Sequence, residues 1–563
     1  MRLSEQDASF LYGETASGPL HTASIFVVDG NLAYETVLEH FRARMHLVPR
    51  YRQKLAFVPF NLGHPKWVDD TDFAVENHVK PFSVTPGSTL EEAADEILEL
   101  NGKLLDRNQP LWACYVVDGV PGKTLLLQQV HHAMIDGVSG IDLTMILMDL
   151  EPEVAPPPPP EAPWVPEPEP SPLELITEAV RENAETFGEE LRRPPPTDEA
   201  SRGLLANATR AMSRFFSNPA ILAPWNAGLV GPKRKMRWSI HPFSEFREIR
   251  RAFGGTINDV VLAVISEAAA RYLRDHDEDT DGKHLRIMCP VSVRTEDEQG
   301  ALGNRVSGIF PTLPAWPMDA ESRYSAVLAE TNAIKENQEA QALTLMNESS
   351  MSMPAALMAP TLLVGTSFDP TAFAAQHPGP VLPKLGPRPP FFGFNFTCTN
   401  VPGVQVPLYI AGHKLEKFLG ILMLGGPLGY GVAIVSYNQQ MMFGMIAETR
   451  LMPDLENMVA AMEDAFAELL DAARAKNGPA ATPPAEIEAP RVQEPEGKAS
   501  KDKSKAKKSA KKASNPSKGK NAAAKKGAAK KGAAKTKTAA NTSAAATPET
   551  DPEAPTDKES NNG

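Results

Sequence analysis

The sequence predicts an α/β protein of two halves, followed by a disordered tail. Apolar runs of strand length alternate with segments of helical spacing on both sides of a proline-dense stretch, and the composition changes abruptly near residue 478. The chain is long enough for two or three domains. Its 42% hydrophobic and 23% charged residues are typical of a globular protein.

The first half, residues 1–152, is expected to alternate strands with helices. The expected strands are 22–30, 111–119 and 123–131, and the expected helices are 32–48, 88–105 and 138–151. Ser88 or Thr89 is a suitable N-cap for the second of these helices, because a hydroxyl oxygen can accept a hydrogen bond from the first turn.

A proline-rich strap and crossover, residues 153–235, separates this half from the second. Its core, VAPPPPPEAPWVPEPEPSP, favours an extended conformation, and we infer no function for it.

The second half, residues 236–477, repeats the mixture. We expect strands at 284–294, 304–314 and 391–403, a hairpin at 429–449, and helices at 256–275, 321–340 and 455–475. Thr256 or Asn258 lies near the first helix start, and Asp454 is the expected cap of the last helix.

The tail, residues 478–563, is predicted to be disordered because it has too little apolar surface to offset its ordering entropy. Lys498–Lys537 carries 16 lysines against one acidic residue, whereas the whole chain has a net charge of -13. Such a tail can bind an anionic lipid surface or nucleic acid, or simply keep the chain soluble.

No apolar window is long enough to span a membrane, and the N-terminus lacks the layout of a secretory signal. The three cysteines, Cys114, Cys289 and Cys398, show no metal or redox spacing. These features favour a cytoplasmic protein.

The segment QQVHHAMIDGVSG places His131, His132, Asp136 and Gly137 where a strand is expected to end. Side chains alternate along a strand, so the two histidines should occupy different environments. One can act as a general base, and the aspartate can pair with it or with an arginine. Purely structural polar residues and a zinc site are the alternatives. No second Cys/His cluster supports zinc, so we expect no metal.

HHAMIDG matches the HHxxxDG signature of acyltransferases with a chloramphenicol acetyltransferase-like fold. The remaining motifs make the chain similar to bacterial wax ester synthase/diacylglycerol acyltransferases. These motifs are LSEQDASFLYGE, the Pro110–Leu111–Trp112 element, the Asn258–Asp259 element, CPVSVR, LGNRVS and NFTCTNVPG. The resemblance covers about residues 1–475.

The resemblance implies two chloramphenicol acetyltransferase-like halves with a tunnel between them. It implies that His132 is the general base and that Asp136 pairs with Arg294. Asn258 either stabilises an oxyanion or caps a helix, with Asp259 beside it. Pro110, Leu111 and Trp112 pack the core or line the tunnel.

The implied reaction moves a long-chain acyl group from acyl-CoA, a substrate rather than a cofactor, to diacylglycerol or a long-chain alcohol. Because the products are insoluble, we expect peripheral association with the inner membrane or with lipid inclusions. No G-x-S-x-G nucleophile is present, which favours direct transfer. A condensation-type enzyme that uses carrier-protein thioesters and a non-catalytic coat protein of lipid inclusions are the alternatives.

Overall fold

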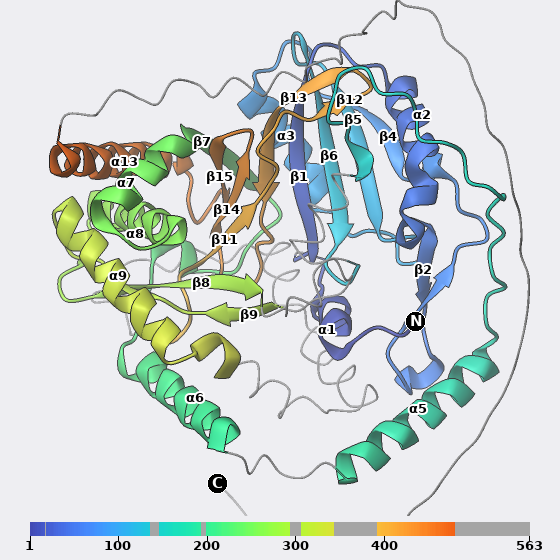
Figure 1. The fold of residues 1–563 in the computed structure, drawn as a ribbon, viewed down its shortest axis with the longest axis horizontal. Coiled ribbons are helices and arrows are strands. Elements are labelled where there is room, and N and C mark those ends of the chain that lie inside the picture. The colour runs from blue at the N-terminus through green and yellow to red at the C-terminus, as the bar shows by residue number, and fades with distance from the viewer. Residues whose placement is uncertain (17, 135–145, 193–198, 293–305, 343–390, 479–563) are drawn as a thin grey trace, which may run out of the picture. The chain divides into compact units, whose positions relative to one another are not determined.

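Two β-sheets form the centre of the molecule, as predicted for an α/β protein (Figure 1). The computed structural model describes residues 1–16, 18–134, 146–192, 199–292, 306–342 and 391–478. All of them belong to a contact unit that spans Met1–Pro483. The predicted tail lies outside the described residues from residue 479 onward.

The first sheet has the strand order β12-β13-β1-β6-β5-β4. Its strands are β1 (His21–Asp29), β4 (Val79–Ser83), β5 (Trp112–Asp118), β6 (Lys123–His131), β12 (Tyr409–Ile410) and β13 (His413–Ile421). Neighbouring strands are antiparallel except β4 and β5. Strand β6 is buried at every position after Lys123, which makes it the core strand of this half.

The helices of the first half are α1 (Glu5–Gly13), α2 (Tyr34–Arg44) and α3 (Leu90–Asn101), and β2 (Gln53–Ala56) pairs with β3 (Lys66–Asp69). Thr89, and not Ser88, caps α3 through a capping box with Glu92. Short 3₁₀ turns are η1 (Met45–Leu47), η2 (Pro49–Arg52), η3 (Pro59–Asn61), η4 (Val75–Asn77) and, in the second half, η5 (Pro224–Asn226).

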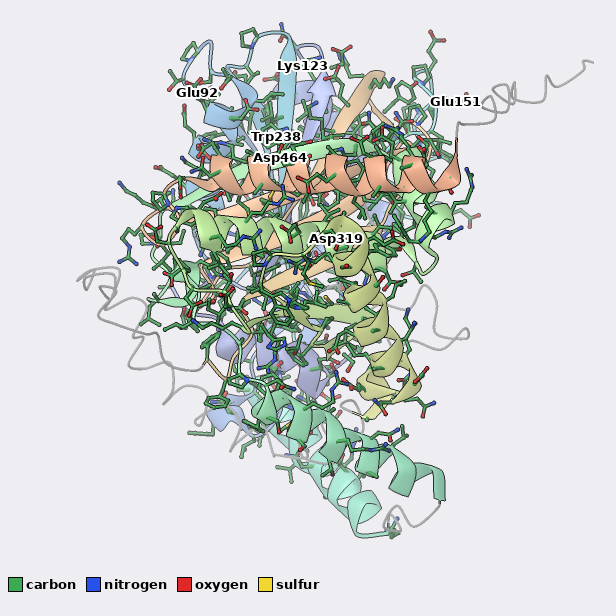
Figure 2. All side chains as sticks on the ribbon, turned by 90° about the vertical axis from the view of Figure 1, so that its left-hand side faces the viewer. Glu92, Lys123, Glu151, Trp238, Asp319 and Asp464 are labelled. Atoms are coloured by element: carbon green, nitrogen blue, oxygen red, sulfur yellow. The ribbon has the colours of Figure 1, made fainter. Side chains whose placement is uncertain are left out.

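The second sheet has the order β10-β8-β11-β14-β15-β7, and β9 also pairs with β8. Its strands are β7 (Arg234–Pro242), β8 (His284–Ser292), β9 (Val306–Ile309), β10 (Thr312–Pro314), β11 (Phe396–Pro402), β14 (Tyr430–Tyr437) and β15 (Gln440–Glu448). Its helices are α7 (Phe243–Phe253), α8 (Ile257–Asp275), α9 (Ala320–Glu336) and α13 (Leu455–Asn477). Seen from the helical side, α13 lies in front of the sheet and carries the exposed Asp464 (Figure 2).

Strands β14 and β15 contribute to both hydrophobic cores. Every residue of β14 is buried. Val432 and Ile434 pack with α8 and α13, whereas Val435 packs with the core of the first half. Met442 and Met445 of β15 divide between the two cores in the same way. Because side chains alternate across a strand, these two strands present apolar side chains to both cores.

Strand β13 was not predicted, and it crosses the predicted boundary between the halves. It comes from the second half of the sequence but pairs with β1 of the first sheet. A close approach makes the crossing possible, because a Cβ atom on Gly444 would overlap the carbonyl oxygen of Gly420. The boundaries at 152, 235 and 477 otherwise stay predictions.

The strap and the crossover contact the first half. Trp164 lies under the guanidinium of Arg52, 4.5 Å from carbon to ring centroid, and makes an edge contact with Phe73. Helix α5 (Pro172–Arg192) buries Leu175 and Ala179 beside β2 and β3, and α6 (Glu199–Ser217) follows it. The crossover is thus partly held by packing and by the ion pairs of α5 with Arg2 and Lys66.

Most expected elements agree with the structure within a few residues, but Asp454 does not behave as predicted. It occupies the N-cap position of α13, yet its side chain makes no capping hydrogen bond. Its carboxylate instead accepts hydrogen bonds from Tyr272 and His276, which ties α13 to the end of α8. The helix expected at 138–151 falls mostly outside the described residues.

Within the described ranges, no single helix combines the length and hydropathy of a membrane span. Helices α7 and α8 meet both criteria only as a pair, with a bend of 97° between them.

The close contact between β13 and β15 gives a first prediction. Replacing Gly444 with Ala should lower the free energy of unfolding by roughly 1–3 kcal/mol, because the added methyl overpacks a buried contact. The measurement is urea unfolding followed by circular dichroism. Gly203→Ala in α6 is the control, since its Cβ would meet nothing within 4 Å and should stabilise the helix by about 0.5–1 kcal/mol. Equal midpoints for Gly444→Ala and the parent chain would contradict this account.

Candidate active site

The histidine pair lies at the end of β6, where the chain leaves the first sheet. The backbone N–H of His131 donates to the carbonyl of Leu111 at 2.9 Å, and that of His132 donates to Leu20 at 3.0 Å. The two bonds point to opposite neighbours, β5 and β1. The side chain of His131 is 1% exposed, whereas His132 is half-buried. The two rings therefore occupy different environments.

The backbone of the following turn orients the ring of His131. Its Nδ1 accepts a hydrogen bond from the backbone N–H of Ala133 at 3.0 Å, so that nitrogen carries no proton. The proton then lies on Nε2, which is 3.4 Å from Oε1 of Glu14. This distance is an electrostatic contact rather than a formed hydrogen bond, since Nε2 has no partner of good geometry. The ring of His131 is therefore buried beside the site, with its orientation set by Ala133 and Glu14.

Glu14, beside His131, accepts hydrogen bonds from two other segments of the chain. Its carboxylate accepts the backbone N–H of Leu20 at 3.0 Å and the guanidinium of Arg107 at 2.9 Å. Burial alone would raise the pKa of Glu14. The close contact with His131, together with the hydrogen bonds from Leu20 and Arg107, outweighs that effect and lowers the pKa to about 2. Glu14 is therefore ionised at neutral pH.

The ring of His132 stacks on Phe10 of helix α1. The ring centroids are 4.1 Å apart and the planes differ by 11°. A stacked neighbour covers one face of an imidazole, whereas the hydrogen bonds of the ring nitrogens lie in the ring plane. His132 thus has a fixed ring plane and is the histidine of the pair that is open to partial solvent contact.

A further buried histidine lies behind the pair. His21 faces His131 across β1 and β6. Its Nε2 lies 2.9 Å from Oδ1 of Asn101. Burial lowers the pKa of His21 to about 4, despite the opposing effect of Asn101. His21 is therefore neutral at neutral pH and adds no charge beside His131.

The Pro110–Leu111–Trp112 element packs the core and supports the site through its backbone. Leu111 is fully buried, and its carbonyl accepts the N–H of His131. The indole of Trp112 donates to the carbonyl of Tyr51 at 2.9 Å and stacks against the rings of Tyr51 and His78. Of the two predicted roles, these contacts favour packing.

Asn258 and Asp259 begin α8 in the second half. Thr256 is the N-cap of that helix, so the predicted alternative role of Asn258 as the helix cap is wrong. Asp259 completes the capping box by accepting the backbone N–H of Thr256 at 2.7 Å. Asn258 instead accepts a long hydrogen bond, 3.5 Å, from Asn400 of β11. The structure thus joins two of the sequence motifs through their asparagines.

Three predicted site residues, Asp136, Gly137 and Arg294, lie outside the described residues. Beyond these residues, Asp149 holds the chain against the first sheet through backbone hydrogen bonds with Tyr409 of β12. Asp149 also accepts the guanidinium of Arg44 at 2.6 Å.

Among the described residues, no group of three or more His, Cys, Asp or Glu side chains could hold a metal ion. The zinc site that is an alternative interpretation of the motif includes Asp136, which lies outside the described residues.

The sequence was compared with protein families. The wax ester synthase/diacylglycerol acyltransferase catalytic domain matches residues 3–261, and the C-terminal domain of the same family matches residues 302–470. The chain belongs to the wax ester synthase/diacylglycerol acyltransferase family. The resemblance inferred from the motifs is confirmed, and the chain is an acyltransferase enzyme.

Relatives named as diacylglycerol O-acyltransferases match most of this chain and nearly all of their own length. A putative diacylglycerol O-acyltransferase of Mycobacterium tuberculosis is 27% identical over 489 residues, which is 84% of this chain and 90% of the relative. A probable diacylglycerol O-acyltransferase of the same organism is 27% identical and covers 83% and 95%.

The fold is shared with solved structures. The wax ester synthase/diacylglycerol acyltransferase from Marinobacter aquaeolei VT8 has a TM-score of 0.53 at 22% identity, and covers 84% of this chain and 100% of that one. The first condensation domain of the calcium-dependent antibiotic synthetase, solved with a substrate analogue, has a TM-score of 0.50 at 12% identity and covers 83% and 94%. The predicted acyltransferase fold is confirmed.

The local sequence does not mark Phe10, Glu14 or Arg107 as site residues, although Phe10 and Glu14 lie in a family motif. Their contacts with the histidine pair span more than a hundred positions, and no local pattern indicates them.

The buried Glu14 gives a second prediction. Its folded pKa, about 2, lies below its ordinary value of 4.5, so its carboxylate stabilises the fold above that ordinary value. The contribution is lost as the pH falls through about 2. Glu14→Gln should therefore lower the free energy of unfolding by roughly 3 kcal/mol at pH 7, and the deficit should shrink as the pH falls. Denaturant unfolding at several pH values measures it.

The exposed carboxylate of Glu151 supplies the matched control (Figure 2). Glu151→Gln should change stability by less than about 0.5 kcal/mol. A pH-independent deficit in Glu14→Gln would mean that the charge of Glu14 does not stabilise the fold.

Proposed function

We propose that the enzyme transfers a long-chain acyl group from acyl-CoA to the hydroxyl of diacylglycerol or of a long-chain alcohol, with His132 as the general base. The observation that carries this proposal is the half-buried ring of His132, whose plane is set by stacking on Phe10. Family membership supports the reaction class, and the diacylglycerol O-acyltransferase names of the relatives support the acceptor.

The reaction is a direct transfer in a ternary complex. A neutral His132 imidazole removes the hydroxyl proton as the oxygen attacks the thioester carbonyl. The tetrahedral intermediate collapses, the carbon–sulfur bond breaks, and the imidazolium returns the proton to the CoA thiolate. The products are an ester and CoA. Acyl-CoA is consumed as a substrate, and the proposal includes no cofactor or metal.

We assign supporting roles to the remaining motif residues. Asn258 is the proposed oxyanion donor, because its side-chain amide can donate a hydrogen bond while its Oδ1 accepts from Asn400. Asp136 is proposed to pair with Arg294, and Gly137 to give the loop its backbone freedom. Substrates are proposed to enter a tunnel between the two halves from opposite mouths.

Replacing His132 with Ala tests the base directly. Release of CoA from palmitoyl-CoA in the presence of diacylglycerol should fall at least about a hundredfold, which is the ordinary contribution of a general base. His46→Ala, at a half-buried histidine of η1, should retain parental activity. Full activity in folded His132→Ala would refute the base assignment. Parallel assays with acyl-carrier-protein thioesters test the condensation-type alternative, which requires a preference for that donor.

We also infer peripheral association with the inner membrane or with lipid inclusions. Exposed apolar side chains near α5 support it: Phe60 is 85% exposed and Leu173 72%. Leu173 and Val180 lie seven residues apart, so both project from one side of the helix. An open cleft of about 510 Å³ beside them is lined by Phe57, Pro59, Pro172 and Leu175 among others. The 16 lysines of Lys498–Lys537 supply charge for an anionic lipid surface.

A chain that ends at Gly478 tests the role of the tail. Full-length protein should float with anionic vesicles at low salt and detach at high salt, because the tail attraction is electrostatic. The truncated chain should lose this binding and keep acyl transfer in detergent. Equal vesicle binding by both chains would contradict the proposed role. Binding to DNA but not to vesicles would assign the tail to nucleic acid instead.

A further inference from the structure

Helix α1 contacts both members of the histidine pair. Phe10 stacks on His132, and Glu14, one helical turn later at the end of the helix, lies beside His131. Glu14 also reaches the backbone of His132 indirectly. It accepts the N–H of Leu20, and the carbonyl of Leu20 accepts the N–H of His132, each at 3.0 Å. The side chain and the backbone of His132 are thus both held from α1.

The helix itself is fixed at both ends. Ser4 caps its N-terminus by accepting the N–H of Asp7 at 3.0 Å, and Leu3 donates to the carbonyl of Pro65 at 2.9 Å. At the C-terminal end, the guanidinium of Arg107 binds the carbonyl of Leu11 and the carboxylate of Glu14. A helix held in this way can impose an orientation on the rings it contacts.

The stacked ring also has an electrostatic consequence. The face of a phenyl ring carries negative charge density and attracts a cation placed above it within about 6 Å. His132 is neutral before it accepts the alcohol proton and positive afterwards, according to the proposed function. The attraction from Phe10 therefore grows as the proton moves, and an interaction that is stronger in the transition state accelerates the reaction.

We propose that Phe10 is a positioning residue for acyl transfer: its ring sets the plane of the His132 imidazole and stabilises the imidazolium that forms during proton removal. This inference rests on the proposed function of His132 as the base. It assigns to the N-terminal motif a role in catalysis, through a residue that does not touch the reacting oxygen.

Three variants isolate the aromatic face from simple packing. Phe10→Leu keeps apolar bulk but removes the ring, whereas Phe10→Tyr keeps the ring. Phe73→Leu is a matched control, because Phe73 is also half-buried and also stacks on a histidine of the first half, His78, with centroids 5.4 Å apart. The readouts are the single-turnover rate of acyl transfer, the KM values for both substrates, and the thermal midpoint.

The single-turnover rate of Phe10→Leu should fall about two- to thirtyfold, which is the range of a cation–π attraction expressed as a rate. Its KM values should stay within about twofold of the parent, since the attraction is absent in the ground state. Phe10→Tyr should restore the rate, and Phe73→Leu should leave it unchanged. If Phe10→Leu is recovered unfolded, Phe10→Met replaces it, because methionine fills similar volume without a ring.

Two results would overturn the inference: a parental rate in Phe10→Leu, or a rate in Phe10→Tyr as low as that of Phe10→Leu. An equal loss in Phe73→Leu would also overturn it, because the effect would then be general packing. His132→Ala is assayed beside them. If that variant is inactive while Phe10→Leu is fully active, only the role of Phe10 fails. If His132→Ala is fully active, the proposed base fails.

Discussion

The candidate site depends on a chain of hydrogen bonds that runs from Arg107 through Glu14 and Leu20 to the backbone of His132. The first and last of these links join segments that are far apart in the sequence, and the ionised carboxylate of Glu14 accepts from both Arg107 and Leu20. Burying a carboxylate costs free energy unless its oxygens accept hydrogen bonds. The groups that donate to Glu14 are therefore expected to keep their positions around it. The histidine pair takes its position from that constraint.

The two halves of the enzyme are joined by shared strands and by polar contacts such as the ion pair between Asp95 of α3 and Arg237 of β7. Strands β14 and β15 present one face to each core, and β13 extends the first sheet beside β1. Since β1 is also the neighbour of β6, the strand that ends at the histidine pair, the second half helps to hold the sheet on which the pair lies. A change in the packing of β13 is therefore expected to reach the site through β1.

The sequence predicted those features that have local causes. Strand β6 ends at His131 because an apolar run ends there, and α8 starts at Ile257 because Thr256 before it is a suitable N-cap. It did not predict β13, whose partner in β1 lies nearly four hundred residues away. Nor could it predict the stacking of Phe10 on His132, because ring contacts depend on the tertiary placement of α1. The family motifs indicated the histidine pair but not the residues that orient it.

The tertiary contacts of the proline-rich strap could not be predicted from the sequence either. Its proline content predicted an extended conformation, yet only the structure gives its contacts, through Trp164 and through the ion pairs of α5 with Arg2 and Lys66. Arg2 also donates to the carbonyl of His64, whose ring contacts Tyr12 of α1. The crossover thus touches the same N-terminal region that supports the site.

The most direct test of the central claim is a crystal structure of the enzyme with a long-chain alcohol and a non-reactive acyl-CoA analogue. The account predicts the alcohol oxygen about 3 Å from a ring nitrogen of His132, in the plane of the imidazole. An alcohol oxygen bound away from that ring, or a metal ion bound to it, would contradict the account.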